Sequence, residues 1–444
     1  MDIISQVAKA MQTILTTVSD TAGQTCGFIK RKRKLTGAKF VQMLVFGWLA
    51  SPEATYDELS QTAATIGVTL TPQAIEKRFT QQAADTLKTV LDASVEQVIA
   101  ADPQAVAILL RFNGVLVDDS SWIVLPDALA AIWRGCGGNT EDNTQSALKV
   151  HLRWDLLTGA FNHLTLTDAT THDSTVACQA ETPPGSLRLA DLGYFSLDEL
   201  MAQDDIGAFW LTRVKTNCAI FDRDGNRIEL ATWLNEQQAA EVELAVELGA
   251  KTHLPARLFA VQVTEEVANR RLRQLRKRAK DKGKTPSKAR LRLAKWNILA
   301  TNAPIEKLTM AEAMVLAKVR WQIELMFKLW KSHGHLDSSR SEKPWRVLCE
   351  VYAKLIAMII QHWILLTSSW QFPNRSLVKA SKTVSKHALH LAAALAKAQI
   401  QPLVEALTTI ARCLTVGCRI YRRKAQPATY QLLLELTDES EQLA

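Results

Sequence analysis

Two short apolar runs that each end in aspartate constrain the fold of this chain more than any other feature. The first, Val115-Leu116-Val117, leads into Asp118 and Asp119, and the second, Leu187 to Ala190, leads into Asp191. Short apolar runs of this kind are typical of buried strands. We therefore expect two core strands with carboxylates at the points where they end.

A third carboxylate, Glu324, lies in a stretch with helical periodicity. Arg320, Lys328 and Lys331 are spaced so that they share one face of a 3.6-residue helix with it. A carboxylate flanked by cations suits a metal ligand beside DNA phosphates, and an ordinary i,i+4 ion-pair face gives the same pattern. Three such carboxylates can hold two divalent cations about 3.5–4 Å apart for phosphoryl transfer. Acidic residues at strand ends also occur by chance, so other features of the sequence are needed to distinguish a metal site from a chance arrangement.

Between about residues 105 and 215 the hydrophobic period changes to two. Val150, Leu152, Trp154 and Leu156 alternate with polar residues, and Thr158-Gly159 then turns the chain. Further strands are expected at 164–167 and 209–214, with a helix over 196–202 before the second. Strands followed by a strand–helix–strand unit predict an α/β fold, with a mixed sheet flanked by helices.

Residues 1–104 have helical periodicity. Within them, 56–78 has the layout of a helix-turn-helix: Gly67 ends one helix, Thr71 caps the next and Pro72 takes its first position. A plain helical hairpin fits the same pattern. The basic run Lys30–Lys34 suits phosphates, or else a solvated tail.

Residues 216–308 are interpreted as an insertion. Short strand signals at 218–221, 227–231 and 258–264 precede a very basic stretch from Arg270 to Arg292. The segment Lys295–Asn302 follows as a strand with Trp296 near its head. Helix returns at Thr309, which forms a capping box with Glu312. From about 336 the chain is mostly helical and ends in an acidic tail.

Composition points to a polyanionic partner. The net charge is +8 and the pI about 9.1, which favours nucleic acid, although a basic surface can serve solubility alone. Seven cysteines without a C-x-x-C pair indicate reduced thiols and argue against a zinc ribbon. No apolar signal core opens the chain, and Val347–Leu366 carries charged residues that indicate a buried core helix. A cytoplasmic protein without membrane partners is expected.

Together these segments resemble the bacterial insertion-sequence transposases with the signature Tyr-x2-Arg-x3-Glu-x6-Lys and a DDE triad. The resemblance covers nearly the whole chain and is most specific at 119–126, 189–195 and 320–331. It implies a ribonuclease-H-like mixed sheet flanked by helices, interrupted by a β-rich insertion, with helical N- and C-terminal regions. The implied parts are a DNA-binding region 1–104, a first core part 105–215, the insertion 216–308, a core-completing helix 309–335 and a C-terminal region 336–444.

The resemblance assigns catalytic and metal-binding roles to Asp119, Asp191 and Glu324. The family's first aspartate precedes a small residue and a hydroxyl residue, so Asp119 matches and Asp118 does not. The implied cofactors are two Mg²⁺ or Mn²⁺ ions. In these transposases the chemistry cuts the element end and joins it to target DNA, in some members through a hairpin.

The same resemblance implies a set of DNA-contacting residues. Trp296 matches a tryptophan that holds a flipped base during hairpin formation, and Trp321 an aromatic that stacks near it. Core packing is the alternative for both. One departure is Ala317, which stands where the signature has tyrosine. The full DNA-binding set is Arg213, Lys215, Trp296, Arg320, Trp321, Lys328 and Lys331.

We therefore predict a transposase that binds the terminal inverted repeats of its element and works as a homodimer in a synaptic complex at the bacterial nucleoid. A ribonuclease-H-like nuclease that cuts without joining is one alternative, which the basic insertion argues against. A transposase descendant that only binds DNA is the other. The intact triad argues against that reading, and Ala317 keeps it open.

Overall fold

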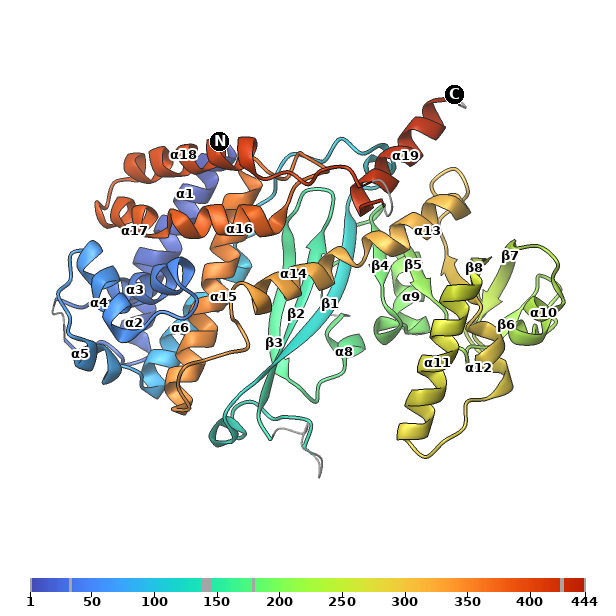
Figure 1. Cartoon of the computed structure of the whole chain (residues 1–444), viewed down its shortest axis with the longest axis horizontal. Helices are drawn as coiled ribbons and strands as arrows, with labels where there is room; N and C mark the ends of the chain where they lie inside the picture. The colour runs from blue at the N-terminus through green and yellow to red at the C-terminus, as the bar shows by residue number, and fades with distance from the viewer. Residues whose placement is uncertain (1, 32–33, 138–144, 178–179, 424–426, 443–444) are drawn as a thin grey trace. The chain divides into compact units, whose positions relative to one another are not determined.

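The structure is a computed structural model that describes residues 2–31, 34–137, 145–177, 180–423 and 427–442 (Figure 1). They form two compact units, each assembled from separate stretches of chain. The first unit combines Met1–Val106, Asp119–His172 and Gln322–Gln431. The second combines Ala107–Asp118, Asp173–Trp321 and Leu432–Ala444. In the predicted basic run Lys30–Lys34, Lys32 and Arg33 fall outside the described residues, as does Cys178 among the cysteines.

The N-terminal part of the first unit is helical. Its elements are α1 (Ile3–Thr13), the π-helix η1 (Ile14–Val18), α2 (Ser19–Thr25), α3 (Gly37–Ala50), α4 (Tyr56–Thr65), α5 (Pro72–Glu76) and α6 (Gln81–Glu96). Local signals set these boundaries as predicted. Helix α3 ends before Ser51-Pro52, and the Thr71 side chain caps α5, whose first residue is Pro72. The second helix of the candidate helix-turn-helix is only five residues long.

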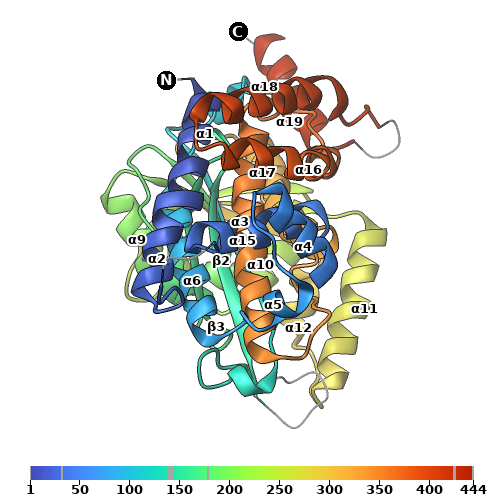
Figure 2. The same ribbon diagram turned by 90° about the vertical axis from the view of Figure 1, so that its left-hand side faces the viewer.

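Helix α15 (Pro344–Leu366) forms the centre of the first unit. All its residues from Arg346 onward are buried, and it packs against α3 and α6. Figures 1 and 2 show α15 among the N-terminal helices and the C-terminal ones, which are α16 (Leu377–Lys386), α17 (Ala388–Ala396) and α18 (Ile400–Gly417). Within the described residues, α15 alone has the length and apolar composition of a membrane span, and that apolar stretch is entirely buried. The predicted core helix is confirmed.

A mixed sheet runs through the described residues in the order β3-β2-β1-β4-β5-β9-β8-β7-β6. In the first unit, β2 (Ala147–Asp155) and β3 (Phe161–Asp168) form an antiparallel hairpin. Gly159 makes its turn with a φ of +78°, and an added Cβ would lie 2.5 Å from Leu366 and 2.6 Å from Trp370. The turn therefore needs glycine both for its backbone conformation and for its close packing. The described strands confirm the predicted α/β class.

In the second unit, the start of β1 (Val115–Val124) pairs in parallel with β4 (Leu187–Ala190). Strand β4 then pairs in parallel with β5 (Phe209–Arg213). The strands of residues 216–308 continue this arrangement, because β9 (Trp296–Thr301) pairs antiparallel with β5. The remaining strands are β6 (Ile220–Phe221), β7 (Glu241–Leu248) and β8 (Leu254–Gln262).

Helices complete both units. The second unit contains α7 (Ala107–Leu110), α8 (Asp173–Ala177), the 3-10 helix η3 (Leu192–Tyr194), α9 (Leu197–Asp205), α10 (Leu230–Glu236), α11 (Glu265–Asp281), α12 (Lys288–Leu293) and α13 (Met310–Val319). The first unit adds the 3-10 helix η2 (Asp127–Leu129) and α14 (Gln322–Ser332), and α19 (Thr429–Gln442) ends the chain. The basic stretch after Arg270 is thus mostly helical, and residues 216–308 also contain α10 and the strands β6 to β9.

Candidate active site

Asp119 and its neighbour Asp118 lie inside β1, not at its end. The strand continues to Val124, so the expectation that it stops at the carboxylates is wrong. Adjacent side chains on a strand point to opposite faces. Asp118 is 4 % exposed, and its carboxylate accepts a hydrogen bond from Arg188 Nε at 2.5 Å. Asp119 is half-buried, and its Oδ1 accepts from the Ser120 N–H at 2.9 Å. Of the two, only Asp119 lines the cleft described next.

The first unit brings Asp119 and Glu324 to one cleft of about 430 Å³. Glu324 lies in the first turn of α14, and Asp119 belongs to β1. The cleft combines carboxylates, hydroxyls and ammonium groups, and its lining is Asp119, Ser120, Ser121, Glu324, Phe327, Lys328, Lys331, Ser332 and Asp337. Two residues predicted as catalytic and two predicted to hold phosphate therefore share this cleft.

Lys331 joins α14 to β1 at the cleft. Its Nζ donates a hydrogen bond to the Trp122 carbonyl oxygen at 2.8 Å. Burial lowers the pKa of the Lys331 ammonium, and the charge of Asp337 acts in the opposite direction. The side chain is thus held at the cleft wall, where an anionic group would meet its charge.

Asp191 belongs to the second unit and directly follows β4. It is half-buried and caps η3, where its Oδ1 accepts from the Leu192 N–H at 2.6 Å. Asp191 lies two residues beyond Leu189, which pairs with Val117 in the parallel β1–β4 ladder. A strand terminus followed by a tight turn is therefore what orients this carboxylate.

The cleft of the first unit offers a divalent cation only oxygen donors. The Asp119 and Glu324 carboxylates and the Ser120 and Ser121 hydroxyls line it, and hard cations such as Mg²⁺ take oxygen ligands. In the described part of the chain, no three His, Cys, Asp or Glu side chains are grouped as ligands of one metal ion. The donor chemistry fits a hard cation, with two carboxylates from this unit.

Arg213 and Lys215 line a cavity of about 260 Å³ in the second unit. Arg213 ends β5 and is exposed. Lys215 is half-buried: its Nζ donates to the Phe195 carbonyl oxygen at 2.9 Å and lies 5.6 Å from the Phe195 ring centre. Arg213 is therefore available to a ligand, whereas Lys215 also secures the loop that follows Asp191.

Trp296 is a core residue in this structure. Its side chain is 6 % exposed and packs in the hydrophobic core of the second unit, which also contains Trp210 and Leu258. It begins β9, as predicted, but the hypothesis that its ring is exposed for a flipped base is not met. Strand pairing between Trp296 and Gln262 fixes the residue at the sheet, and its ring packs inward.

The predicted single helix from Thr309 through Lys331 is two helices. Helix α13 ends at Val319 and α14 begins at Gln322, with Arg320 and Trp321 between them. The Trp321 N–H bonds the Lys318 carbonyl oxygen at 3.1 Å, a tighter turn than an α-helix makes. Trp321 is 55 % exposed, so core packing does not account for it. Arg320 thus lies in the turn between the two helices, and Glu324 lies in the first turn of α14.

Two charged residues have roles that sequence patterns did not single out. Asp337 lines the cleft of the first unit from the loop after α14. In the second unit, Arg271 donates to the Trp296 carbonyl at 3.1 Å and to Asn297 Oδ1 at 2.7 Å. Burial lowers the pKa of Arg271, and the like charges of Arg213 and Arg270 lower it further. It shares a cavity of about 320 Å³ with Arg213, Ala317, Lys318 and Arg320.

These features define an α/β protein with an oxygen-donor cleft that lysines border, a site suited to phosphate-bearing substrates. The chain belongs to the Transposase DDE domain family, whose characteristic sequence it matches over residues 111–360. Enzymes of this family cleave and transfer DNA, and the family generally uses divalent metal ions.

Curated relatives agree with this assignment. The transposase for insertion sequence element IS231F of Bacillus thuringiensis subsp. israelensis is 29 % identical over 388 residues, covering 81 % of this chain and 79 % of the relative. The transposase for insertion sequence element IS1151 of Clostridium perfringens is 27 % identical over 366 residues, covering 77 % and 76 %. The predicted insertion-sequence transposase class is confirmed at the family level.

Among solved structures, the chain is similar to the piggyBac transposase in its synaptic complex with hairpin DNA. The identity is 9 %, the TM-score is 0.47, and the similarity covers 92 % of this chain and 85 % of the other.

Proposed function

We propose that this chain binds the terminal inverted repeats of an insertion sequence, cleaves DNA there and joins it to a target by metal-dependent phosphoryl transfer. The observation that carries the proposal is the cleft in which Asp119 and Glu324, distant in sequence, meet Lys328 and Lys331. Carboxylates suit a hard cation and fixed ammonium groups suit phosphate oxygens. One cleft thus combines the two requirements of phosphoryl transfer.

Strand topology supports a ribonuclease-H-like core for this reaction. The antiparallel β2–β3 hairpin stands at one edge of the order β3-β2-β1-β4-β5, and β1, β4 and β5 are parallel. The first two proposed catalytic aspartates belong to neighbouring strands of that order, since Asp119 lies in β1 and Asp191 follows β4. Glu324 comes from α14.

Asp119, Asp191 and Glu324 would hold two divalent cations, Mg²⁺ or Mn²⁺. Such ions supply Lewis acidity, lower the pKa of water and stabilise both the attacking and the leaving oxygen. The protein's own contribution is to fix the carboxylates on a strand, a strand end and a helix. Lys328 and Lys331 hold the non-bridging oxygens of the phosphodiester, where negative charge grows in the transition state.

The proposed reaction consists of two displacements at phosphorus. In the first, a water oxygen bonds to phosphorus, the bond to the 3′ oxygen breaks, and that oxygen gains a proton and becomes a free 3′-hydroxyl. In the second, the oxygen of this hydroxyl loses its proton and bonds to the phosphorus of another phosphodiester, whose bond to a sugar oxygen breaks; that oxygen takes up a proton and becomes a hydroxyl. Attack on the opposite strand gives a hairpin for cut-and-paste transposition, and attack on target DNA gives strand transfer.

For the hairpin step we assign the stacking role to Trp321. A strand that folds back on its partner must unstack a base, and an aromatic ring offsets part of that cost. Trp321 is exposed next to Arg320, whereas Trp296 is buried. The proposed DNA partners are the inverted repeats and the target, with a homodimer in the synaptic complex at the bacterial nucleoid.

A cleavage assay tests the proposed function. Purified protein is incubated with Mg²⁺, labelled DNA that carries the element's inverted repeat, and an unlabelled target, and gels resolve nicked, hairpin and joined products. We expect all three products, and none from Asp119→Asn or Glu324→Gln variants that still bind the repeat. Cutting without joining would identify a nuclease, and binding without cutting would identify a DNA-binding descendant.

A further inference from the structure

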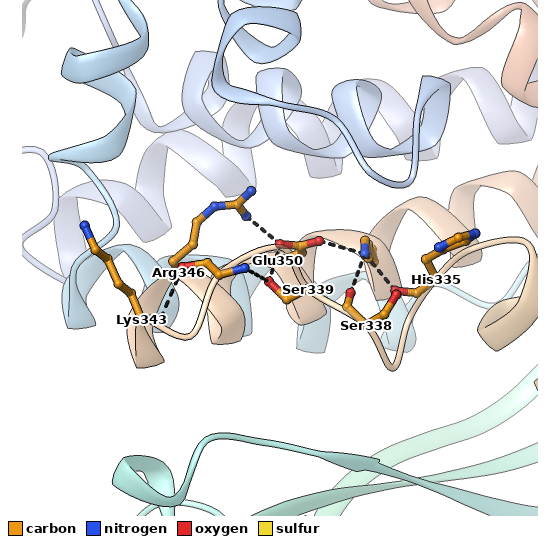
Figure 3. Close-up of polar contacts among 8 residues, drawn as sticks. His335, Ser338, Ser339, Lys343, Arg346 and Glu350 are labelled. Atoms are coloured by element: carbon orange, nitrogen blue, oxygen red, sulfur yellow. Dashed lines mark hydrogen bonds and ion pairs between the residues drawn. The ribbon is translucent and has the colours of Figure 1, made fainter.

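Three charged side chains are buried in a row on α15. Arg346, Glu350 and Lys354 follow at successive turns, and their side chains are 5 %, 4 % and 1 % exposed. Arg346 Nη1 lies 2.8 Å from Glu350 Oε2 (Figure 3). Lys354 Nζ lies 2.7 Å from Glu350 Oε1. We call these three residues the α15 charge triad.

Stability alone does not account for the α15 charge triad. Removing each ion from water costs several kcal/mol, and apolar side chains of similar volume often fold as well or better. Arg346 has further partners, since its guanidinium lies over the rings of Trp48, Tyr56 and Phe79 at 4.5, 5.4 and 4.6 Å. The partners of Glu350 and Lys354 indicate what the other two charges do.

Glu350 and Lys354 hold the loop of residues 335–341, which follows α14. Lys354 Nζ donates to the carbonyl oxygens of His335 and Ser338 at 2.7 and 3.0 Å. Ser339 Oγ donates to Glu350 Oε2 at 2.9 Å (Figure 3). Buried ammonium and carboxylate groups thus make charge-assisted hydrogen bonds to this loop, and such bonds are stronger than neutral ones.

The loop is held in a backbone conformation that needs support. His335 has a φ of +47°, in the left-handed region that side chains rarely adopt. Its carbonyl is bound by Lys354, and its ring Nδ1 lies 3.1 Å from Glu53 Oε1. Residues in such conformations persist where their surroundings over-determine them. The α15 charge triad provides part of the support that holds His335 in this conformation.

The loop of residues 335–341 carries Asp337. The residue is exposed and lines the same cleft as Asp119 and Glu324. Its neighbours in the chain, His335 and Ser338, are the two that Lys354 holds. Lys331 lines the same cleft; its Nζ donates to the Trp122 carbonyl oxygen, and the charge of Asp337 favours its protonated form.

We propose that Asp337 is a positioning residue that orients the Lys331 ammonium toward a DNA phosphate, and that Lys354 acts through it by fixing the loop. This inference rests on the proposed function of the cleft. In this proposal Asp337 acts through Lys331, and Asp119 and Glu324 are the carboxylates of this cleft that hold the metal ions. Its loss therefore misplaces one phosphate-binding group and leaves the catalytic carboxylates intact.

A double-mutant comparison tests the link between the two residues. We expect Asp337→Asn and Lys354→Met each to slow cleavage at saturating DNA by about tenfold, because small misplacements at a site are costly. The double variant should be no slower than either single one, since both changes remove the same positioning. Lys343→Met is the matched control: its side chain is 71 % exposed, pairs with Glu76 and leaves the loop carbonyls bound.

Amide hydrogen exchange gives a readout that does not depend on activity. In Lys354→Met the loop of residues 335–341 should lose protection while α15 keeps it, and in Lys343→Met and Asp337→Asn the loop should stay protected. Additive rate losses in the double variant, or unchanged loop exchange in Lys354→Met, would overturn the proposal. If wild type cleaves nothing under any condition, the proposed function fails, and the exchange result still decides whether Lys354 holds the loop.

Discussion

At the scale of single residues, β1 separates two adjacent aspartates into different roles. Asp119→Asn removes a carboxylate from an open cleft, so we expect loss of cleavage with an unchanged melting temperature. Asp118→Asn leaves the buried charge of Arg188 with one partner fewer, and breaking a buried pair costs about 3–5 kcal/mol. Thermal melting and the cleavage assay, run on both variants, measure the two effects.

Glu199 provides a control for this comparison, because it is the second partner of Arg188 at 3.2 Å. Glu199→Gln should destabilise the fold in the same direction as Asp118→Asn and leave catalysis in the folded fraction intact. A stable Asp118→Asn protein without activity, beside an active Asp119→Asn, would show that the assignment on β1 is off by one residue.

His362 makes the stability of the first unit depend on pH. Burial lowers its pKa to about 4; its Nε2 lies 2.6 Å from the Gly159 carbonyl, and its ring stacks on Phe161 at 3.8 Å. The unfolded chain, with a pKa near 6.5, binds the proton first as pH falls. Stability is therefore lost between pH 6.5 and 4, by about 3 kcal/mol over the full window.

Denaturant unfolding at a series of pH values measures this loss. The His362→Gln variant keeps a donor for Gly159 and cannot titrate, so its unfolding free energy should fall less steeply between pH 6.5 and 4. Parallel curves for wild type and variant would mean that the imidazole titrates normally in the folded state.

The two tryptophans should respond in opposite ways to replacement by alanine. Trp296→Ala empties a core site, and such changes cost about 3–5 kcal/mol of stability. Trp321→Ala removes an exposed ring, so the melting temperature should barely move while hairpin formation falls more than nicking does. Thermal melting, paired with a gel that resolves the two products, tests both. Equal loss of nicking and hairpin in Trp321→Ala would remove its stacking role.

At the scale of elements, α11 is a helix built mainly for its charge. Of its residues only Ala268 is fully buried, and six of its exposed side chains are basic. We expect the logarithm of DNA affinity to fall linearly with the logarithm of salt concentration. Replacing the exposed residues Arg273, Arg276 and Lys280 by glutamine should make that slope shallower by about three, if each side chain releases one counterion. Fluorescence anisotropy between about 50 and 200 mM salt measures that slope.

Three exposed lysines on and after α16 and α17 make a charge-matched control, namely Lys382, Lys386 and Lys397. Their replacement by glutamine lowers the net charge equally and should leave the slope nearly unchanged. If the slope became shallower by the same amount in both triple variants, net charge alone would explain the salt dependence, and α11 would not be the surface that contacts DNA.

Sequence predicted the elements whose signals are local. Thr71 with Pro72 and the capping box of Thr309 with Glu312 were readable because neighbouring residues determine where a helix begins. The apolar runs before Asp119 and Asp191 predicted two strands for the same reason, and the structure shows that these strands pair. The candidate catalytic carboxylates were recognisable through a family resemblance, since carboxylates after apolar runs are common.

The features that sequence patterns predicted wrongly or missed depend on contacts between distant segments of the chain. Periodicity continues through Arg320, and only the folded chain shows that α13 and α14 are separate helices. Trp296 alternates with its neighbours as any strand residue does, so its burial depends on the core opposite it. Asp337 lies in a loop without a sequence signal, and the α15 charge triad that holds the loop comes from a later helix.

At the scale of the whole molecule, the N-terminal helices belong to a compact unit that later segments of the chain complete. Residues 1–106 share a compact unit with 119–172 and 322–431, and α3 and α6 pack on α15. A fragment of residues 1–104 would expose the apolar surface that α15 covers. We expect such a fragment to lack a cooperative melting transition by circular dichroism and to regain one when a fragment of residues 322–431 is added together with 119–172.

The position of α15 near the end of the chain also affects how the protein is made. A ribosome that adds roughly 5–20 residues per second completes the N-terminal helices tens of seconds before it makes the helix that buries them. Until then the half-made chain exposes apolar helix surface, and for most of that time its cleft lacks the residues of α14. On the proposed function, we therefore expect DNA cleavage only from chains whose synthesis has passed α15. A truncated product that lacks α15 should neither fold this unit nor compete with the full-length chain.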